Sequence, residues 1–209
     1  MSKVAIVDYG ASNSQSVRHA FEVAGAEPVM ATTPDQVLAA DRLVIPGVGA
    51  ANRAIVRLRE RHLDAALTEA VRTRGRPALG ICLGMQVAAA KLHEYGENDG
   101  LGWVEGDVVD LHGVEGIEGR IPHMGWNDVE PVDDAANMFR SVRGRRSFYF
   151  CHSYSIRGAK AETIAATVDL GVKLVAAICD GSFFATQFHP EKSQINGQRL
   201  IENFLAWSP

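Results

Sequence analysis

The sequence Gly80-Ile81-Cys82-Leu83-Gly84-Met85-Gln86 follows the apolar run Pro77-Ala78-Leu79 and opens a helix-like run over residues 87–92. A Gly-x-Cys-x-Gly segment between a strand and a helix is the pattern of a nucleophile elbow, with cysteine in place of serine. The glycines let strand and helix approach closely. The turn presents Cys82 at the top of a sheet, beside helix N–H groups that favour a thiolate. The alternative is a buried cysteine in a glycine-punctuated turn.

Short apolar runs alternate with helical patterns on the N-terminal side of this elbow. The expected strands cover residues 4–7, 28–31 and 43–45. Two of the expected helices carry apolar residues at helical spacing: Val17, Ala20, Phe21 and Ala24, and Leu63, Ala66, Leu67, Ala70 and Val71. A third helix is expected to begin at Thr33-Pro34-Asp35, with proline in its first turn. Residues 1–90 therefore follow a βαβαβαβα order, which predicts a parallel sheet with right-handed crossovers.

The chain changes character after Gly100, where strand patterns follow one another with short connections. These patterns cover residues 103–111, 121–132, 148–156 and 163–168. Residues 172–179 and 183–188 read as a hairpin around Asp180-Gly181, and the C-terminal helix has Leu200, Ile201, Phe204 and Leu205 on one face. We therefore expect one α/β domain over residues 1–209, with a mixed, largely parallel open sheet flanked by helices.

Charge and composition exclude several classes of protein. The chain has 209 residues and a net charge of −4, from 21 basic and 25 acidic residues, so it lacks the basic character of a nucleic-acid-binding protein. No apolar run approaches the roughly 18–20 residues of a membrane span. The start Met1-Ser2-Lys3-Val4 leads into a strand pattern, so we expect no signal peptide. The three cysteines then predict reduced thiols and a cytoplasmic location. The spacing of His and Cys residues predicts no metal site, and we expect no cofactor.

A thiol nucleophile needs a base, and the base needs an orienting group. His189 ends an apolar strand and is followed by Pro190-Glu191. Pro190 favours extended backbone at His189, and residues i and i+2 of an extended segment point to the same side. Glu191 can therefore hold one ring nitrogen of His189 while the other faces Cys82, as in a catalytic triad. The alternative is a histidine at a strand end beside a surface glutamate.

The other cysteines are interpreted differently. Cys151 and His152 are adjacent in an expected strand, so their side chains point to opposite faces and do not share a hydrogen bond. We assign Cys151 to the core and His152 to a pocket wall. Cys179 is expected to be a small buried apolar residue.

Acyl transfer also needs donors for a developing oxyanion. The N–H of Leu83, directly after the nucleophile, is one candidate. A second comes from Pro46-Gly47-Val48-Gly49, which leaves the C-terminal end of a neighbouring strand, where ligands bind in open α/β sheets. We expect the Val48–Gly49 peptide to turn inward or outward and so to act as a control. The alternative is a simple βα turn.

Several segments resemble the class I glutamine amidotransferases, whose fold is flavodoxin-like. They occur in family order over essentially the whole chain: Val7-Asp8-Tyr9-Gly10 with Asn13, Pro46–Gly49, Gly80–Gln86, Ile121–Asn127, Tyr149–Tyr154 and Gln187–Ser193. Within the family, the finer markers are similar to the glutaminase subunits of histidine biosynthesis. The Pro-Gly-Val-Gly loop is informative because most relatives have Pro-Gly-Gly-x-Gly there.

The resemblance implies a function and a set of roles. Cys82 would attack the side-chain amide of glutamine, His189 would transfer protons and Glu191 would hold His189. Ammonia would pass to a separate (β/α)₈-barrel cyclase subunit in a heterodimer. The remaining positions match two regions of the family: the glutamine pocket, at Gln86, Ser153 and Tyr154, and segments near the partner interface, at Asn13, Met124, Trp126 and Tyr149.

The chain departs from the family pattern at Ser12, Ser14, Gln15 and Ala51, where Gly, Leu, Arg and Phe are usual. These positions flank the oxyanion loop and the first βα turn, so they bear on docking more than on chemistry. The alternatives to this assignment are the glutaminase of another synthase, a stand-alone γ-glutamyl hydrolase and a non-catalytic scaffold subunit.

Overall fold

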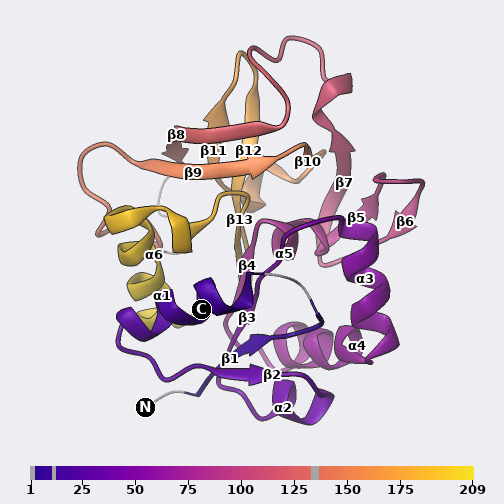
Figure 1. Ribbon diagram of the computed structural model, residues 1–209, viewed down its shortest axis with the longest axis vertical. Coiled ribbons are helices and arrows are strands. Elements are labelled where there is room, and N and C mark those ends of the chain that lie inside the picture. Colours follow the sequence, from indigo (N-terminus) through magenta and orange to yellow (C-terminus); the bar gives the residue numbers. More distant parts are fainter. Residues whose placement is uncertain (1–2, 11–12, 133–136) are drawn as a thin grey trace.

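The computed structural model describes residues 3–10, 13–132 and 137–209. Nine of its strands form one sheet, in the order β2-β1-β3-β4-β13-β12-β11-β8-β9 (Figure 1). Their bounds are β1 Val4–Val7, β2 Val29–Ala31, β3 Arg42–Ile45, β4 Ala78–Ile81, β8 His123–Pro131, β9 Ser147–His152, β11 Ile164–Asp169, β12 Lys173–Asp180 and β13 Phe183–Thr186. Strands β2, β1, β3, β4 and β13 are parallel, and the remaining pairs are antiparallel. The predicted mixed, largely parallel α/β sheet is confirmed.

A smaller four-stranded sheet lies beside the large one, in the order β10-β7-β5-β6. Its strands are β5 Ala89–Leu92, β6 Asn98–Asp99, β7 Val104–Asp110 and β10 Tyr154–Arg157. The expected strand over residues 148–156 is therefore two strands in different sheets. The break falls at Ser153, between β9 and β10, where the chain leaves one sheet for the other.

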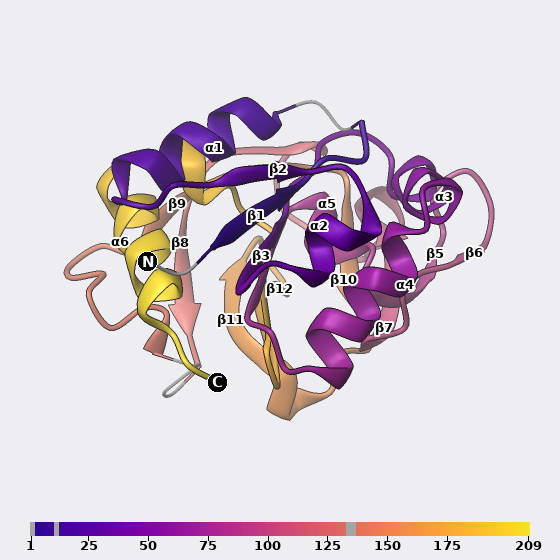
Figure 2. The same cartoon turned by 90° about the horizontal axis from the view of Figure 1, so that it is seen from below.

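Helices cover both faces of the parallel strands (Figures 1 and 2). Helices α1 (Ser14–Val23) and α6 (Gln194–Ala206) pack on one face, where Phe21 and Phe204 meet edge to face. Helices α2 (Pro34–Leu38), α3 (Ala51–Glu60) and α4 (Leu63–Thr68), the last continued by a π-helical turn at Glu69–Thr73, cover the other.

The core follows the alternation of side chains along each strand. In β1, Val4 and Ile6 belong to the core layer that includes Phe21 and Phe204. Ala5 and Val7 belong to the layer on the opposite side of the sheet. Both faces of β1 are thus buried, as the continuous apolar run predicts for a central parallel strand.

One prediction next to the elbow was wrong, and one helix was missed. Residues 87–92 were expected to continue the helix that starts after Cys82, but helix α5 is only Leu83–Gln86 and Ala89–Leu92 forms β5. Pairing of β5 with β6 and β7 outweighs the helical propensity of the alanines. Helix α3 was not predicted, although Ala51, Ala54, Ile55 and Leu58 are buried at helical spacing.

In the described residues, no helix has both the length and the apolar character needed to cross a membrane.

Candidate active site

Cys82 lies in a strained turn directly after β4. Its backbone has φ 51° and ψ −99°, a conformation that costs a non-glycine residue free energy and is typical of a nucleophile elbow. Glycine is required on both sides. A Cβ at Gly84 would overlap the carbonyl of Ile45, and a Cβ at Gly80 would come within 2.8 Å of the Gly84 carbonyl oxygen. The Cys82 N–H donates to Thr186 O at 2.7 Å, which ties the elbow to β13.

His189 follows the C-terminal end of β13 and is held next to Glu191. The distance between His189 Nδ1 and Glu191 Oε1 is 2.8 Å, and the two side chains are 1% and 0% exposed. Burial opposes protonation of His189, but interactions with Cys82 and Glu191 outweigh it and raise the pKa of His189 to about 10. The structure thus brings together the three residues expected to form a triad.

Two buried glutamines connect the elbow to β10. Gln86 Nε2 donates to the main-chain oxygen of Tyr154 at 2.9 Å and to Gln187 Oε1 at 3.2 Å. The backbone oxygen of Tyr154 can only accept, so Gln86 presents its NH₂ group to it and to Gln187. Gln187 must therefore turn its own oxygen towards Gln86 and its NH₂ group away from it. Gln187 Nε2 then faces Cys82 Sγ at 3.6 Å. Gln187 was not predicted as a site residue, although it lies only two residues before His189.

The Pro46–Gly49 loop reaches the elbow from β3. Tyr9 is buried, and its hydroxyl donates to Pro46 O at 2.8 Å, so the start of the loop is fixed. Gly49 has φ 106°, a conformation that favours glycine. Among the described residues, neither the Val48 nor the Gly49 N–H has a hydrogen-bond acceptor. The Leu83 N–H is the first of α5 and has no intrahelical partner, so all three donors are available near Cys82.

A cavity of about 370 Å³ joins these groups. Eight of the predicted site residues line it: Val48, Gly49, Cys82, Leu83, Gln86, Ser153, Tyr154 and His189. Glu191 does not line the cavity but lies behind His189. His152 also lines it, as expected for a pocket wall, and five further lining residues were not predicted: Glu94, Tyr95, Pro122, Cys151 and Lys192.

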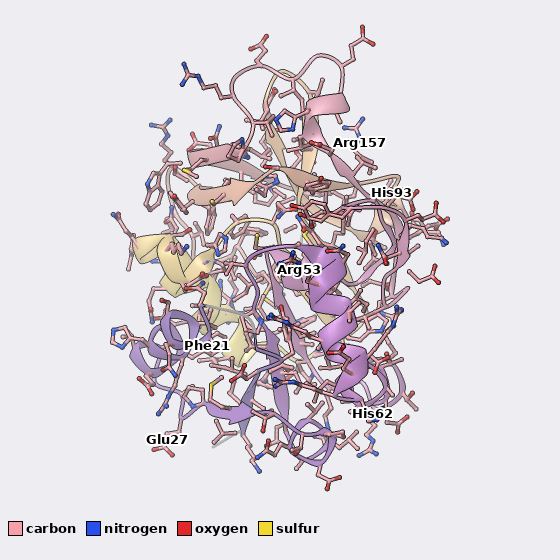
Figure 3. The ribbon with its side chains drawn as sticks, turned by 45° about the vertical axis from the view of Figure 1, so that its right-hand side comes forward. Phe21, Glu27, Arg53, His62, His93 and Arg157 are labelled. Atoms are coloured by element: carbon pink, nitrogen blue, oxygen red, sulfur yellow. The ribbon has the colours of Figure 1, made fainter. Side chains whose placement is uncertain are left out.

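Glu94 stands between this cavity and a second one of about 460 Å³, which shares the Val48–Gly49 wall and also contacts Arg53. Arg53 lies near the N-terminal end of α3 (Figure 3). Glu94 Oε2 accepts from the Ala51 N–H at 2.7 Å and so caps α3, whose own N-cap residue provides no side-chain bond. Burial raises the pKa of Glu94, while the Ala51 N–H and Arg53 oppose the rise.

His152 does not pair with Cys151, as expected, but forms a buried pair with His123. His152 Nδ1 contacts Tyr154 O at 2.8 Å, so this nitrogen carries the proton and Nε2 accepts from His123 Nδ1 at 2.9 Å. Burial is the main cause that lowers the pKa of His152 to about 3. Cys151 was expected in the core, but it is only partly buried and lines the cavity.

Comparisons with known proteins identify the family. The family description "Glutamine amidotransferase class-I" matches residues 5–207. The chain belongs to the class I glutamine amidotransferases. It is 43% identical to the imidazole glycerol phosphate synthase subunit HisH of Ruegeria pomeroyi, with 98% of this chain and 99% of the relative aligned. It is 41% identical to the HisH 1 subunit of Campylobacter jejuni, over 97% of this chain and 98% of the relative.

Solved structures show the same amidotransferase fold at lower identity. A structure described as a glutamine amidotransferase superposes with a TM-score of 0.76 at 20% identity and covers 97% of both chains. The glutaminase domain of Trypanosoma brucei CTPS, solved with bound acivicin, gives a TM-score of 0.69 at 19% identity, over 99% of this chain and 93% of that one.

The four residues expected near a partner lie in two places in this amidotransferase. Met124 and Trp126 on β8 are 60% and 46% exposed, and Trp126 packs edge to face on Tyr149 of β9. We name Met124, Trp126 and Tyr149 the aromatic face. Asn13 instead turns its amide inward, where Nδ2 donates to Glu191 Oε1 at 2.6 Å.

Three of the four residues that depart from the family pattern lie at the starts of helices. Ser14 and Gln15 form the first turn of α1, and Ala51 begins α3. Ser12 lies outside the described residues.

Proposed function

We propose that this chain is the glutaminase subunit of an imidazole glycerol phosphate synthase, in which Cys82, His189 and Glu191 hydrolyse glutamine. The observation that carries the proposal is one cavity lined by Cys82, His189, Leu83 and the Val48–Gly49 segment, with Glu191 bound to His189 behind its wall. Family membership and the HisH relatives support it.

The first half of the reaction releases ammonia. The sulfur of Cys82 attacks the side-chain carbonyl carbon of glutamine, and the negative charge that develops on the oxygen is stabilised by N–H groups of Leu83 and of the Val48–Gly49 segment. His189 carries a proton at neutral pH because its pKa is raised. It gives this proton to the leaving nitrogen when the C–N bond breaks. The products are a glutamyl thioester, ammonia and a neutral His189.

The second half restores the enzyme. Neutral His189 takes a proton from a water molecule as the water oxygen attacks the thioester carbon. The C–S bond breaks, glutamate leaves, and His189 is again protonated beside Cys82. Glu191 does not change its protonation in this sequence but keeps the imidazole oriented, as the carboxylate of a triad does.

A cyclase subunit with a (β/α)₈ barrel is the proposed recipient of the ammonia. It would make imidazole glycerol phosphate and an aminoimidazole carboxamide ribonucleotide from a phosphoribulosyl formimino substrate. The aromatic face suits such docking, because exposed Met, Trp and Tyr are typical interface anchors. Lys192 connects this face to the cavity: it lines the cavity, and its Nζ lies 5.9 Å from the centre of the Tyr149 ring.

Docking is proposed to control the oxyanion loop. Gly49 allows the Val48–Gly49 peptide to turn towards or away from the reacting carbonyl. If the cyclase binds the inward state more tightly, docking shifts the population towards it, and glutamine hydrolysis rises.

The test is glutamate release by the chain alone and then with the cyclase and its nucleotide ligand. We expect a large rise on mixing. A full rate in the isolated chain, unchanged by the partner, would point to a stand-alone γ-glutamyl hydrolase or to another synthase.

Substitutions test the roles within the site. Cys82→Ala should abolish glutaminase activity while cyclase binding persists, and glutamine-dependent turnover by this variant would exclude Cys82 as the nucleophile. Glu191→Gln should be milder than His189→Ala, because the amide retains part of the orienting contact. A chloroketone analogue of glutamine should label Cys82, and a scaffold subunit would give no adduct.

A further inference from the structure

Asn13 contacts the triad from the opposite end of the chain. Its Nδ2 donates to Glu191 Oε1 at 2.6 Å, across 178 residues of sequence. The same oxygen contacts His189 Nδ1 at 2.8 Å. The other carboxylate oxygen, Oε2, is buried and has no hydrogen-bond partner among the described residues. Asn13 and His189 are thus the two side chains that hydrogen-bond this carboxylate within the part of the chain described.

The position of Asn13 just before α1 makes this contact unusual. Asn13 is the N-cap residue of α1, where an asparagine side chain ordinarily accepts a hydrogen bond from the N–H of the second or third helical residue. Its side chain makes no such bond. The ionised carboxylate of Glu191 can only accept, so it is the NH₂ group of Asn13 that faces it. The amide is directed to Glu191 instead of to the helix.

The backbone supports the same orientation. Asn13 has φ 88° and ψ −2°, in the left-handed region that asparagine tolerates better than most residues. The Val17 N–H donates to Asn13 O at 3.3 Å, which fixes the residue on the first turn of α1. Helix α1 also packs against the Pro190–Lys192 turn that carries Glu191. The amino end of α1 therefore lies beside the turn that carries the Glu191 carboxylate.

We propose that Asn13 is a positioning residue of the glutaminase, whose amide holds the Glu191 carboxylate in the orientation that aligns His189 with Cys82. The inference rests on the proposed function and adds a fourth residue to the Cys82–His189–Glu191 series. Without the amide, one oxygen of a buried carboxylate loses one of its two donors, and the carboxylate can rotate away from Nδ1. His189 then spends less time aligned with the sulfur and with the leaving nitrogen.

Two substitutions separate the amide from the backbone. Asn13→Gly removes the donor and accepts a positive φ without strain. Asn13→Asp keeps the shape and the tolerance of this φ but replaces the donor with a second carboxylate. Asn137 offers a matched control, because it is exposed, has φ 56° and lies in a different segment. Asn137→Gly and Asn137→Asp therefore reproduce the chemical changes away from the triad.

Kinetics of the complex with saturating cyclase give the main readout. We expect both Asn13 variants to lower kcat for glutamine hydrolysis by about 10-fold, the size of effect seen when metal ligands lose an outer hydrogen-bonding partner, with KM unchanged. Both Asn137 variants should match the parent. In the isolated chain, alkylation of Cys82 by the chloroketone analogue of glutamine should also be slower in both Asn13 variants and unchanged in both Asn137 variants. This rate reports the alignment of the triad independently of docking. Thermal melting identifies any variant whose loss comes from unfolding.

The outcomes distinguish the inference from the function on which it rests. Parent kcat and parent labelling rates in folded Asn13→Gly and Asn13→Asp would overturn the positioning role. So would variants that only bind the cyclase more weakly and recover parent kcat at saturation, since Asn13 would then be a docking residue. If the parent itself releases no glutamate and Cys82 is not labelled, the glutaminase assignment fails instead.

Discussion

Cys82 lies close to two side chains that the sequence places far away. Gln187 Nε2 is 3.6 Å from its sulfur, and His189 lines the same cavity. Each of these side chains is buried, so each interaction acts with little screening by water. The reactivity of this thiol therefore depends on a few side chains of the segment that follows β13.

Gln187→Leu should slow alkylation of Cys82 by iodoacetamide at pH 7 by about 10-fold, because the hydrogen bond to the sulfur is lost. Gln187→Glu should slow it further, since a carboxylate would replace the donor. The rate is measured on the Cys82 peptide by mass spectrometry, with Gln198→Leu on α6 as the control. Equal rates in all variants would show that Gln187 does not stabilise the sulfur.

His189 should stay protonated through neutral pH. Its pKa is raised from 6.5 to about 10 because the interactions with Cys82 and Glu191 outweigh burial. In Glu191→Gln one raising cause is removed while burial remains, so the pKa should fall. Imidazole nitrogen shifts, followed by NMR between pH 5 and 10, measure both values. A parent ring that titrates near 6.5 would contradict the raised pKa.

At the scale of single elements, the Pro46–Gly49 loop is held at its start by one hydroxyl. The buried Tyr9 hydroxyl donates to Pro46 O, and a Cβ at Gly47 would collide with it. The loop can therefore approach Leu83 only because glycine follows Pro46.

Tyr9→Phe should destabilise the fold by about 1–2 kcal/mol, because the buried Pro46 carbonyl loses its donor. It should also lower kcat for glutamine hydrolysis, since the loop is no longer fixed at its start. Urea unfolding and steady-state kinetics measure the two effects, and Tyr95→Phe, at an exposed tyrosine, is the control for stability. Unchanged stability and kcat would show that the hydroxyl has no role in the loop.

The sequence predicted elements best where the signal is local. The parallel strands β1 to β4 and the hairpin of β12 and β13 follow from continuous apolar runs and from Asp180-Gly181. Helix α3 was missed because its cap is Glu94, from a distant segment, although its apolar spacing was visible. Strand β5 was predicted as helix because its pairing with β7 is not visible in a run of alanines.

The same distinction holds for the candidate site. The elbow motif and the His189-Pro190-Glu191 segment pointed to residues that the structure places together, and their catalytic roles stay predictions. Gln187 and Glu94 were missed as site residues because their contacts are with Cys82 and Ala51, far from them in the chain. Asn13 was expected to face a partner, and no local pattern indicates that its amide reaches Glu191.

At the scale of the whole molecule, the aromatic face and the edge strand β2 lie at opposite ends of the large sheet (Figure 1). The aromatic face is on β8 and β9, next to the turn that carries Glu191 and Lys192. A partner that covers it would therefore meet the wall of the cavity as well.

Trp126→Ala should weaken cyclase binding by about 30-fold or more, since a central tryptophan is a typical hot spot worth at least about 2 kcal/mol. Val29→Ala, on β2, should leave binding unchanged. Isothermal titration calorimetry with the purified cyclase measures both. Parent affinity in Trp126→Ala would place the docking surface elsewhere.

The place of β13 in the sheet bears on how the protein is made. This strand lies between β4 and β12, yet it is the last of the described strands to leave the ribosome. Until it arrives, β4 has an unpaired edge, and the Cys82 N–H lacks its acceptor Thr186. Contacts between residues so far apart form slowly, and open strand edges invite aggregation. A nascent chain therefore holds an unfinished sheet until β13 is inserted, and the proposed triad is complete only after His189 and Glu191, which follow β13, have been made.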